Sequence, residues 1–324
     1  MRTSHSLSGA DTVAALKRVS WGDRTPYEQE KVSSAICMIP KSFDYHAPAS
    51  LSEALHLLSE NEEAKVLAGG QSLLALMKLR VAAPSVLVDI SKLPDLSYVR
   101  DAENYLAIGA LTTYDAIEHD RTVKEKFAIV NDAVIRIGDQ QIRNLGTIGG
   151  SACHADPAAD LPTVLLAADA QFVIQGKGGQ RVVPALDFFV GVFTTVVGHH
   201  EILTEIRLPY APPTSASAYV KHSLRLADFA IAMAGVTLTM GSGNACREVT
   251  VAIGAAGPTP LRATSAEQYL KGKTLDDDVI MEAAERAVEG VSPASDVHGS
   301  REYRLEMIKV LTRRSLKLAL SRVK

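Results

Sequence analysis

Residues 64–72 read AKVLAGGQS, and residues 143–151 read RNLGTIGGS. In the first stretch, a short run typical of a strand leads into a glycine pair, and LLALMKL follows with a helical pattern. Glycines at the end of a strand let the backbone turn sharply, and a serine there can cap the next helix. Taken alone, this stretch predicts a tight turn between strand and helix, with anion binding as the alternative.

The second stretch places three glycines within residues 146–150, flanked by Thr147 and Ser151. A glycine-rich loop of this kind presents an array of backbone donors that suits a phosphate. Asp160 follows closely enough to meet the hydroxyls of a ligand, as acidic residues do at ribose sites. The alternative is a glycine loop whose aspartates cap helices. Two such segments in one chain favour a dinucleotide.

Other phosphate, metal and hydrolase patterns are absent from the sequence. It contains neither GxGxxG nor GxxxxGK[ST], which disfavours a Rossmann fingerprint and a P-loop. His199 and His200 are adjacent, so on a strand they would point to opposite sides and could not chelate together. His154, Asp156 and Asp160 lack the helical spacing of a zinc site. We therefore predict no metal site and assign no catalytic residue.

Composition and charge exclude several classes of protein. Of the 324 residues, 47% are hydrophobic and 22% charged, which indicates a folded chain with a hydrophobic core. The net charge of −3 provides no positive field for nucleic acid or anionic lipid. The three cysteines are too few and too dispersed for a disulfide framework, so we expect reduced thiols and a cytoplasmic protein. No stretch has the length and apolarity of a membrane span.

The patterning divides the chain into an extension and three folded parts. Residues 1–37 are polar with little apolar periodicity, and we predict that they are a dispensable extension. Alternating strand and helix patterns predict two α/β units, and strands followed by helices predict an α+β domain with a three-stranded sheet. The predicted boundaries are 38–92, 93–214 and 215–324, with C-terminal helices near 264–271, 277–290 and 300–322.

The stretches KVLAGGQSLLALMKLR and RNLGTIGGSACHADPAADLP together resemble the two FAD-binding motifs of the flavoprotein (medium) subunit of molybdenum hydroxylases. The family includes carbon monoxide dehydrogenase and, more distantly, xanthine dehydrogenase. The opening MIPKSFDYHAPASLSEAL and the closing PASDVHGSREYRLEMIKVLTRR are similar to the family as well. The resemblance implies an α+β protein: a two-subdomain FAD-binding fold of the PCMH type, followed by a C-terminal α+β domain.

The resemblance also implies which residues hold FAD. The pyrophosphate would be held by backbone N–H groups of both glycine segments and by the hydroxyls of Ser72 and Thr147. Asp160 would meet the ribityl or ribose hydroxyls, and Leu203 the edge of the adenine or flavin. Ser151 stands where many members have asparagine. The predicted contacts in and around the two segments are Leu67, Ala68, Gly69, Gly70, Gln71, Ser72, Gly146, Thr147, Ile148, Gly149, Gly150 and Ser151.

Three further positions match the family near the isoalloxazine ring. Lys221 and Asp228 stand where the family has polar residues, and Phe229 stands where the branch most similar to this sequence has an aromatic side chain over the ring. These residues are predicted only through the resemblance, because their spacing alone would not single them out.

The resemblance implies an FAD-binding electron-transfer subunit of an oxidoreductase. It would take electrons from a [2Fe–2S] small subunit and pass them to NAD⁺, a quinone or another acceptor. A large subunit with the molybdenum cofactor would oxidise the substrate, in a dimer of heterotrimers. One alternative is a free-standing flavin oxidase or reductase of a related fold. Another is a non-catalytic binding subunit in which FAD is structural.

Overall fold

The structure is a computed structural model that describes residues 38–323, so the predicted extension, residues 1–37, lies outside the described residues. The described residues belong to two compact units. The smaller unit contains residues 38–42 and Leu73–Ala83, and the larger contains Phe43–Ser72 and the chain from Pro84 onward.

The smaller unit contains the helix that was predicted for LLALMKL. This helix, α4, spans Leu73–Lys78. Just after it, Nε of Arg80 donates a hydrogen bond to the carbonyl oxygen of Ile39 at 3.4 Å. That bond joins the two chain segments of the smaller unit: residues 38–42 and the residues that follow α4.

The larger unit begins with a three-stranded parallel sheet of order β1-β3-β2. Helix α3 begins where the side chain of Ser50 accepts a hydrogen bond from the N–H of Glu53, and it buries Ala54, Leu55 and Leu58. These residues share a core with strand β3 and with Ile202 from farther along the chain. The elements are β1 (Asp44–His46), α3 (Leu51–Glu60), β2 (Ala64–Leu67) and β3 (Val86–Asp89).

A second, five-stranded antiparallel sheet has the order β4-β5-β10-β6-β7. Strands β6 and β7 form a hairpin, with pairing from Gln171↔Pro184 to Gly176↔Gly179. Its strands are β4 (Val99–Asp101), β5 (Tyr105–Gly109), β6 (Gln171–Gly176), β7 (Gly179–Pro184) and β10 (Glu201–Pro209), with a small separate pair β8 (Phe189–Gly191) and β9 (Thr194–Thr195). The helices are η3 (Pro94–Leu96), α5 (Tyr114–His119), α6 (Arg121–Lys126), α7 (Ala128–Val134), α8 (Gln140–Leu145), α9 (Ile148–His154), α10 (Asp160–Ala167) and α11 (Ala185–Phe188).

The C-terminal part has a sheet of three long antiparallel strands and a two-residue fourth, in the order β11-β12-β13-β14. The three predicted C-terminal helices are confirmed. The elements are β11 (Ser215–His222), β12 (Ala232–Met240), η4 (Ser242–Asn244), β13 (Cys246–Gly254), β14 (Leu261–Arg262), α12 (Thr264–Leu270), α13 (Asp277–Arg286) and α14 (Arg301–Arg322).

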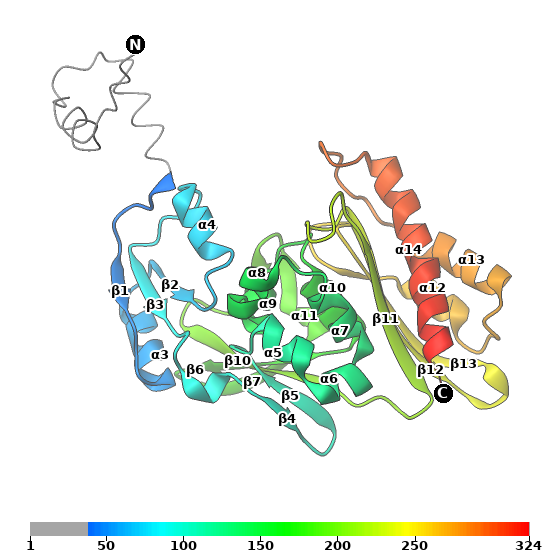
Figure 1. Ribbon diagram of the computed structural model, residues 1–324, viewed down its shortest axis with the longest axis horizontal. Helices are drawn as coiled ribbons and strands as arrows, with labels where there is room; N and C mark the ends of the chain where they lie inside the picture. Colours follow the sequence, from blue (N-terminus) through cyan, green and yellow to red (C-terminus); the bar gives the residue numbers. More distant parts are fainter. Residues whose placement is uncertain (1–37, 324) are drawn as a thin grey trace, which may run out of the picture. The chain divides into compact units, whose positions relative to one another are not determined.

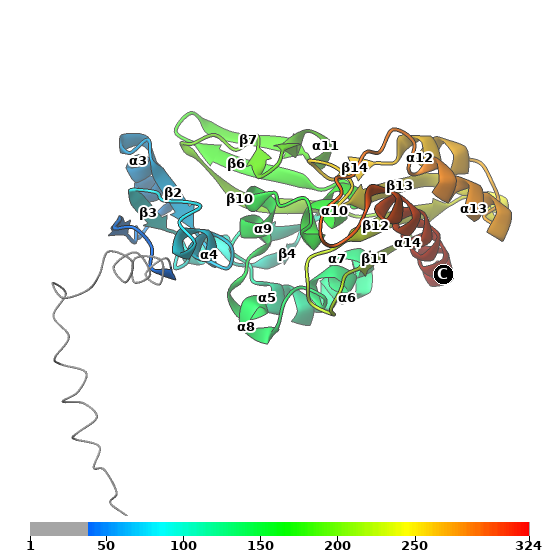
Figure 2. The same cartoon turned by 90° about the horizontal axis from the view of Figure 1, so that it is seen from above.

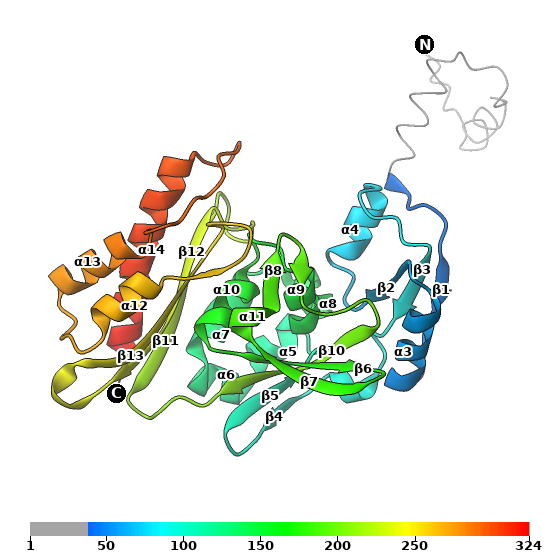
Figure 3. The same cartoon turned by 180° about the vertical axis from the view of Figure 1, so that it is seen from behind.

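Helices cover both faces of this C-terminal sheet. Figures 1 and 2 show α14 lying along one face, and Figure 3 shows α7 and α10 on the other. Successive residues of a strand point to opposite faces. Tyr219 accordingly packs in the core that contains α7 and α10, while Ala218 packs with Leu316 of α14. A sheet that is buried on both sides explains why β12 is apolar along nearly its whole length.

The prediction of a glycine loop at 146–150 is wrong in one respect, because helix α9 already begins at Ile148. The side chain of Thr147 caps the helix by accepting a hydrogen bond from the N–H of Gly150. Ile148 and Ala152, on the buried side of α9, are 0% exposed. Capping and burial of these side chains together outweigh the low helix propensity of the glycines.

Candidate functional site

The first glycine segment, residues 68–72, is the turn that follows β2. Gly70 has a φ of +71°, in the left-handed region that favours glycine. Within the described residues, the backbone N–H groups of residues 69–72 have no hydrogen-bond acceptor. Consecutive backbone donors without partners form the kind of array that binds phosphate.

The second segment, residues 146–151, uses most of its backbone donors within the protein. The N–H of Gly149 donates to the carbonyl of Ala110 at 2.9 Å, and that of Gly150 donates to Oγ1 of Thr147 at 3.0 Å. The N–H of Thr147 has no acceptor among the described residues. The N–H groups of Gly149 and Gly150 thus already have acceptors within the protein, and the ligand contacts of this segment stay a prediction.

Two glycines of the second segment serve close packing. A Cβ on Gly149 would lie 2.5 Å from Cβ of Ala110 and 2.6 Å from its carbonyl oxygen. A Cβ on Gly146 would lie 2.6 Å from the ring of Tyr114. These distances are shorter than van der Waals contact, so both positions require glycine for packing.

The structure brings the two segments together. A Cβ on Gly69 would lie only 1.9 Å from the carbonyl oxygen of Leu145, the last residue of α8. A Cβ on Gly150 would lie 3.9 Å from Cβ of Ala68. The unpartnered donors of the first segment therefore lie beside the start of the second, although the two are more than 70 residues apart along the chain.

Asp160 and Lys221, both predicted site residues, form a buried ion pair in which Nζ of Lys221 lies 3.0 Å from the carboxylate. The hydroxyl of Tyr219 donates to the same carboxylate at 2.6 Å. Nζ of Lys221 also donates to the carbonyl oxygens of Arg136 and Asp228, at 3.0 Å each. Burial raises the pKa of Asp160, and the charge of Lys221 opposes that rise. The carboxylate of Asp160 thus has protein partners.

The remaining predicted residues lie in contrasting surroundings. Leu203 on β10 is 3% exposed and belongs to the hydrophobic core, together with Ile108 of β5. Phe229 is 63% exposed, in the segment between β11 and β12. Leu67, the last residue of β2, is partly buried. The ligand contacts of these residues stay predictions.

Sequence reasoning missed two residues that hold the second segment. The Tyr114 ring packs against Gly146, and burial raises the pKa of Tyr114 to about 12. Arg143 makes side-chain hydrogen bonds to Glu118 of α5 and to Gln140 of α8. The available signal was the position of Arg143 three residues before Gly146.

His199 and His200 lie in a turn with their rings 4.9 Å apart, so the expectation that they point to opposite sides of a strand is wrong. Nε2 of His199 hydrogen-bonds with the carbonyl of Asn61 at 3.0 Å, and Nδ1 of His200 with that of Leu58 at 2.9 Å. These carbonyls belong to the C-terminal end of α3, where the helix leaves acceptors without intrahelical partners. The pair therefore joins α3 to the turn before β10.

No group of three histidine, cysteine or acidic side chains in the described part of the chain is placed to hold a metal ion. Cys246 is buried and Cys153 exposed, and both are free thiols, while Cys37 lies outside the described residues. Across residues 38–323, each helix is too short or too polar to cross a membrane.

Comparisons with known proteins agree with this architecture. A family described as the FAD-binding domain in molybdopterin dehydrogenase matches residues 41–211, and the CO dehydrogenase flavoprotein C-terminal domain matches residues 217–319. The chain is 40% identical over 280 residues to the glyceraldehyde dehydrogenase medium chain of Sulfolobus acidocaldarius, covering 86% of this chain and 99% of that one. It is 38% identical over 288 residues to the carbon monoxide dehydrogenase medium chain of Afipia carboxidovorans, covering 89% and 100%.

A solved structure shows the same fold. A chain of carbon monoxide dehydrogenase from Hydrogenophaga pseudoflava superposes with a TM-score of 0.86 at 37% sequence identity, covering 89% of this chain and 100% of that chain. The sequence matches extend through both the glycine segments and the C-terminal sheet. The chain therefore belongs to the FAD-binding flavoprotein subunits of the molybdenum hydroxylases, a family of oxidoreductases.

Proposed function

We propose that this chain binds one FAD between its two glycine segments and transfers electrons within a molybdenum hydroxylase. The observation that carries the proposal is the contact of Gly69 with Leu145, which places four unpartnered backbone donors beside the second segment. Backbone donors suit a pyrophosphate, which is an anion without a proton to give.

The residues present fit FAD, and we propose a role for each part of the site. The N–H groups of residues 69–72, the hydroxyl of Ser72, and the N–H and hydroxyl of Thr147 would hold the pyrophosphate. When bound, FAD supplies the redox chemistry, because it accepts and releases electrons reversibly. The chain itself positions the cofactor and excludes water around it, so we assign no acid–base residue.

We propose that Asp160 and Lys221 form a fixed pair of charges at the ring or ribityl end of FAD. Their side chains are 6% and 4% exposed, so their orientation is set by the protein rather than by solvent. The carbonyl of Asp228, bound to the same ammonium, holds the segment that leads to Phe229. Leu203 would contribute apolar contact from β10.

The partners follow from the family. We propose a large subunit with the molybdenum cofactor and a [2Fe–2S] small subunit, in a dimer of heterotrimers in the cytoplasm. The substrate would be oxidised on the large subunit, and electrons would leave this chain to NAD⁺, a quinone or another acceptor. We also propose the domain boundaries 38–92, 93–214 and 215–324, since each of these parts contains one of the three larger sheets.

Two measurements on the purified full-length chain test cofactor binding. The protein should be yellow with one FAD per chain, and acid precipitation should release the chromophore, because the AGGQS segment contains no histidine or cysteine that could tether a flavin. A colourless protein that also fails to take up added FAD would refute the proposal.

Co-expression with a molybdenum subunit and a [2Fe–2S] subunit tests electron transfer. Gel filtration should show a stable complex, and substrate-dependent bleaching of the flavin should occur only in that complex. Turnover of an aldehyde or N-heterocycle by the isolated chain, at about 1 s⁻¹ or faster, would instead support a free-standing oxidase. FAD binding with no reduction in the complex would indicate a structural cofactor.

A further inference from the structure

Helix α8 forms one side of the contact between the two glycine segments, because its last residue, Leu145, touches Gly69. It has only six residues, and none of them is buried. Helices this short are not stable in water by themselves, and α8 has little apolar burial to hold it in place. Polar contacts must therefore position it.

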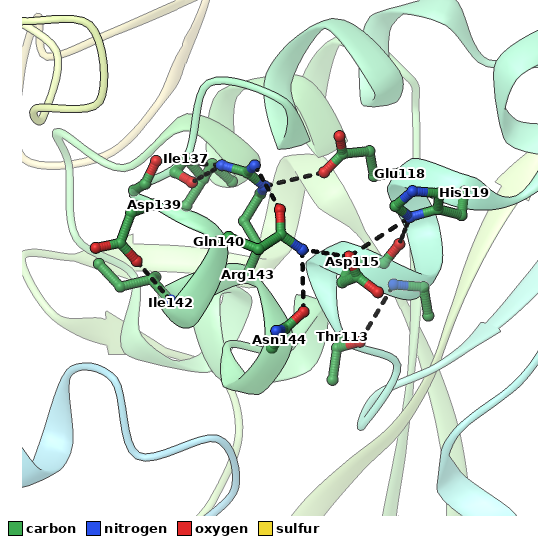
Figure 4. A network of polar contacts seen from close by, with 12 residues as sticks. Thr113, Asp115, Glu118, His119, Ile137, Asp139, Gln140, Ile142, Arg143 and Asn144 are labelled. Atoms are coloured by element: carbon green, nitrogen blue, oxygen red, sulfur yellow. Dashed lines mark hydrogen bonds and ion pairs between the residues drawn. The ribbon is translucent and has the colours of Figure 1, made fainter.

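Arg143 makes most of these polar contacts (Figure 4). Its Nε donates to Oε2 of Glu118 on α5 at 2.9 Å, in an ion pair whose side chains are 15% and 22% exposed. One terminal nitrogen donates to the carbonyls of Ile137 and Gly138, at 3.3 and 3.2 Å. The other donates to Oε1 of Gln140 at 3.0 Å. One guanidinium thus joins α8 to α5 and to the turn that precedes α8.

Gln140 extends this network. Its Nε2 donates to Oδ1 of Asp115 at 2.6 Å and to Oδ1 of Asn144 at 3.1 Å. Figure 4 shows these side chains between α5 and α8. The N-terminal end of α5 is also fixed to the second glycine segment, since the N–H of Tyr114 donates to the carbonyl of Gly146 at 3.0 Å. The start of the second segment is therefore held by both helices: α8 leads directly into Gly146, and α5 binds its carbonyl through Tyr114.

We propose that Arg143 is a positioning residue for FAD. Its guanidinium holds α8 in place, and α8 in turn holds the second glycine segment beside the first, so that both segments can bind the pyrophosphate. Arg143 does not touch the ligand in this proposal. The planar guanidinium meets four acceptors at once, which the single ammonium of lysine cannot do. The inference rests on the proposed binding of FAD between the segments.

The test compares Arg143→Ala and Arg143→Lys with Arg262→Ala in the full-length chain. Arg262 is a matched control, since its side chain is 16% exposed and it pairs with Glu267 at 2.6 Å and Asp169 at 2.7 Å, outside the glycine segments. Apoprotein is titrated with FAD to obtain Kd, the visible circular dichroism of the saturated flavin is recorded, and Tm is measured without FAD.

Both Arg143 variants should raise the Kd for FAD at least tenfold, equivalent to about 1.4 kcal/mol, and change the flavin circular dichroism. Arg262→Ala should lower Tm without altering Kd or the spectrum. If the Arg143 variants bind FAD within twofold of the wild type, the proposal is wrong. If Arg143→Ala fails to fold, the Arg143→Lys variant decides. Failure of the wild type to bind FAD would refute the proposed function itself.

Discussion

The two adjacent glycines of α9 provide the sharpest test of where FAD lies. Gly149 faces Ala110, whereas Gly150 faces Ala68 of the other glycine segment. Changing each to alanine adds one methyl group to the same helix, in directions about 100° apart that meet different neighbours. We expect Gly149→Ala to lower stability and Gly150→Ala to lower the affinity for FAD.

The size of each effect follows from the contacts. Replacing glycine by alanine in a helix stabilises it by about 1 kcal/mol. At Gly150 the new methyl would lie 2.7 Å from Oγ1 of Thr147, and loss of that cap costs about 1 kcal/mol, so stability should hardly change. At Gly149 the methyl meets Cβ and the carbonyl oxygen of Ala110, which cannot swing away. Overpacking of about 3 kcal/mol leaves a net loss of about 2 kcal/mol.

The assay is a thermal melt of each apoprotein followed by titration with FAD. A loss of about 2 kcal/mol should lower Tm by roughly 4–8 °C in Gly149→Ala, with Kd near the wild-type value at low temperature. Gly150→Ala should keep its Tm and raise Kd at least tenfold, or about 1.4 kcal/mol. If Gly150→Ala binds FAD like the wild type, the cofactor does not pass beside α9 and the proposed site is wrong.

Two ion pairs lead to further predictions. Asp160→Asn should lower the free energy of unfolding by about 3–5 kcal/mol in thermal melts, because it leaves the buried ammonium of Lys221 unpaired; an unchanged Tm would show that the pair is dispensable. Hydrogen bonds from Arg304 hold the pKa of Asp296 at about 2. The stability that this pair contributes should be complete above about pH 4 and lost as the pH falls towards 2, so the Tm difference between wild type and Asp296→Asn should shrink over that interval, and a constant difference would contradict the assignment.

Local patterns in the sequence predicted most helices and strands correctly, because each carries its own periodicity. Helix α14 begins at Arg301, where a helix was predicted near residues 300–322. The start of α9 was missed because glycines disfavour helices. What stabilises α9 is a threonine cap together with burial, and burial is a property of the tertiary structure.

The candidate site could be predicted only in part. The two glycine segments were recognised, and the resemblance named Asp160 and Lys221, but nothing local indicated that these two side chains pair, since they are 61 residues apart on α10 and β11. The same limit applies to the contacts of His199 and His200 with α3, which depend on a helix about 140 residues earlier. Periodicity reports which side of an element is apolar; it does not report which element lies opposite.

The glycines show most clearly why a motif does not reveal the role of each of its residues. Gly70 is needed for its left-handed backbone, and Gly69 and Gly149 for close approach of Leu145 and Ala110. At Gly150, by contrast, an added Cβ would lie 3.9 Å from Cβ of Ala68 in the other segment, an ordinary van der Waals distance, although it would crowd Oγ1 of Thr147. A motif of this kind therefore combines residues that form the fold with residues that would face the ligand. A substitution in such a motif affects FAD binding directly only where the added atoms point into the space between the two segments. Which way a side chain points there depends on contacts with residues that are distant in sequence.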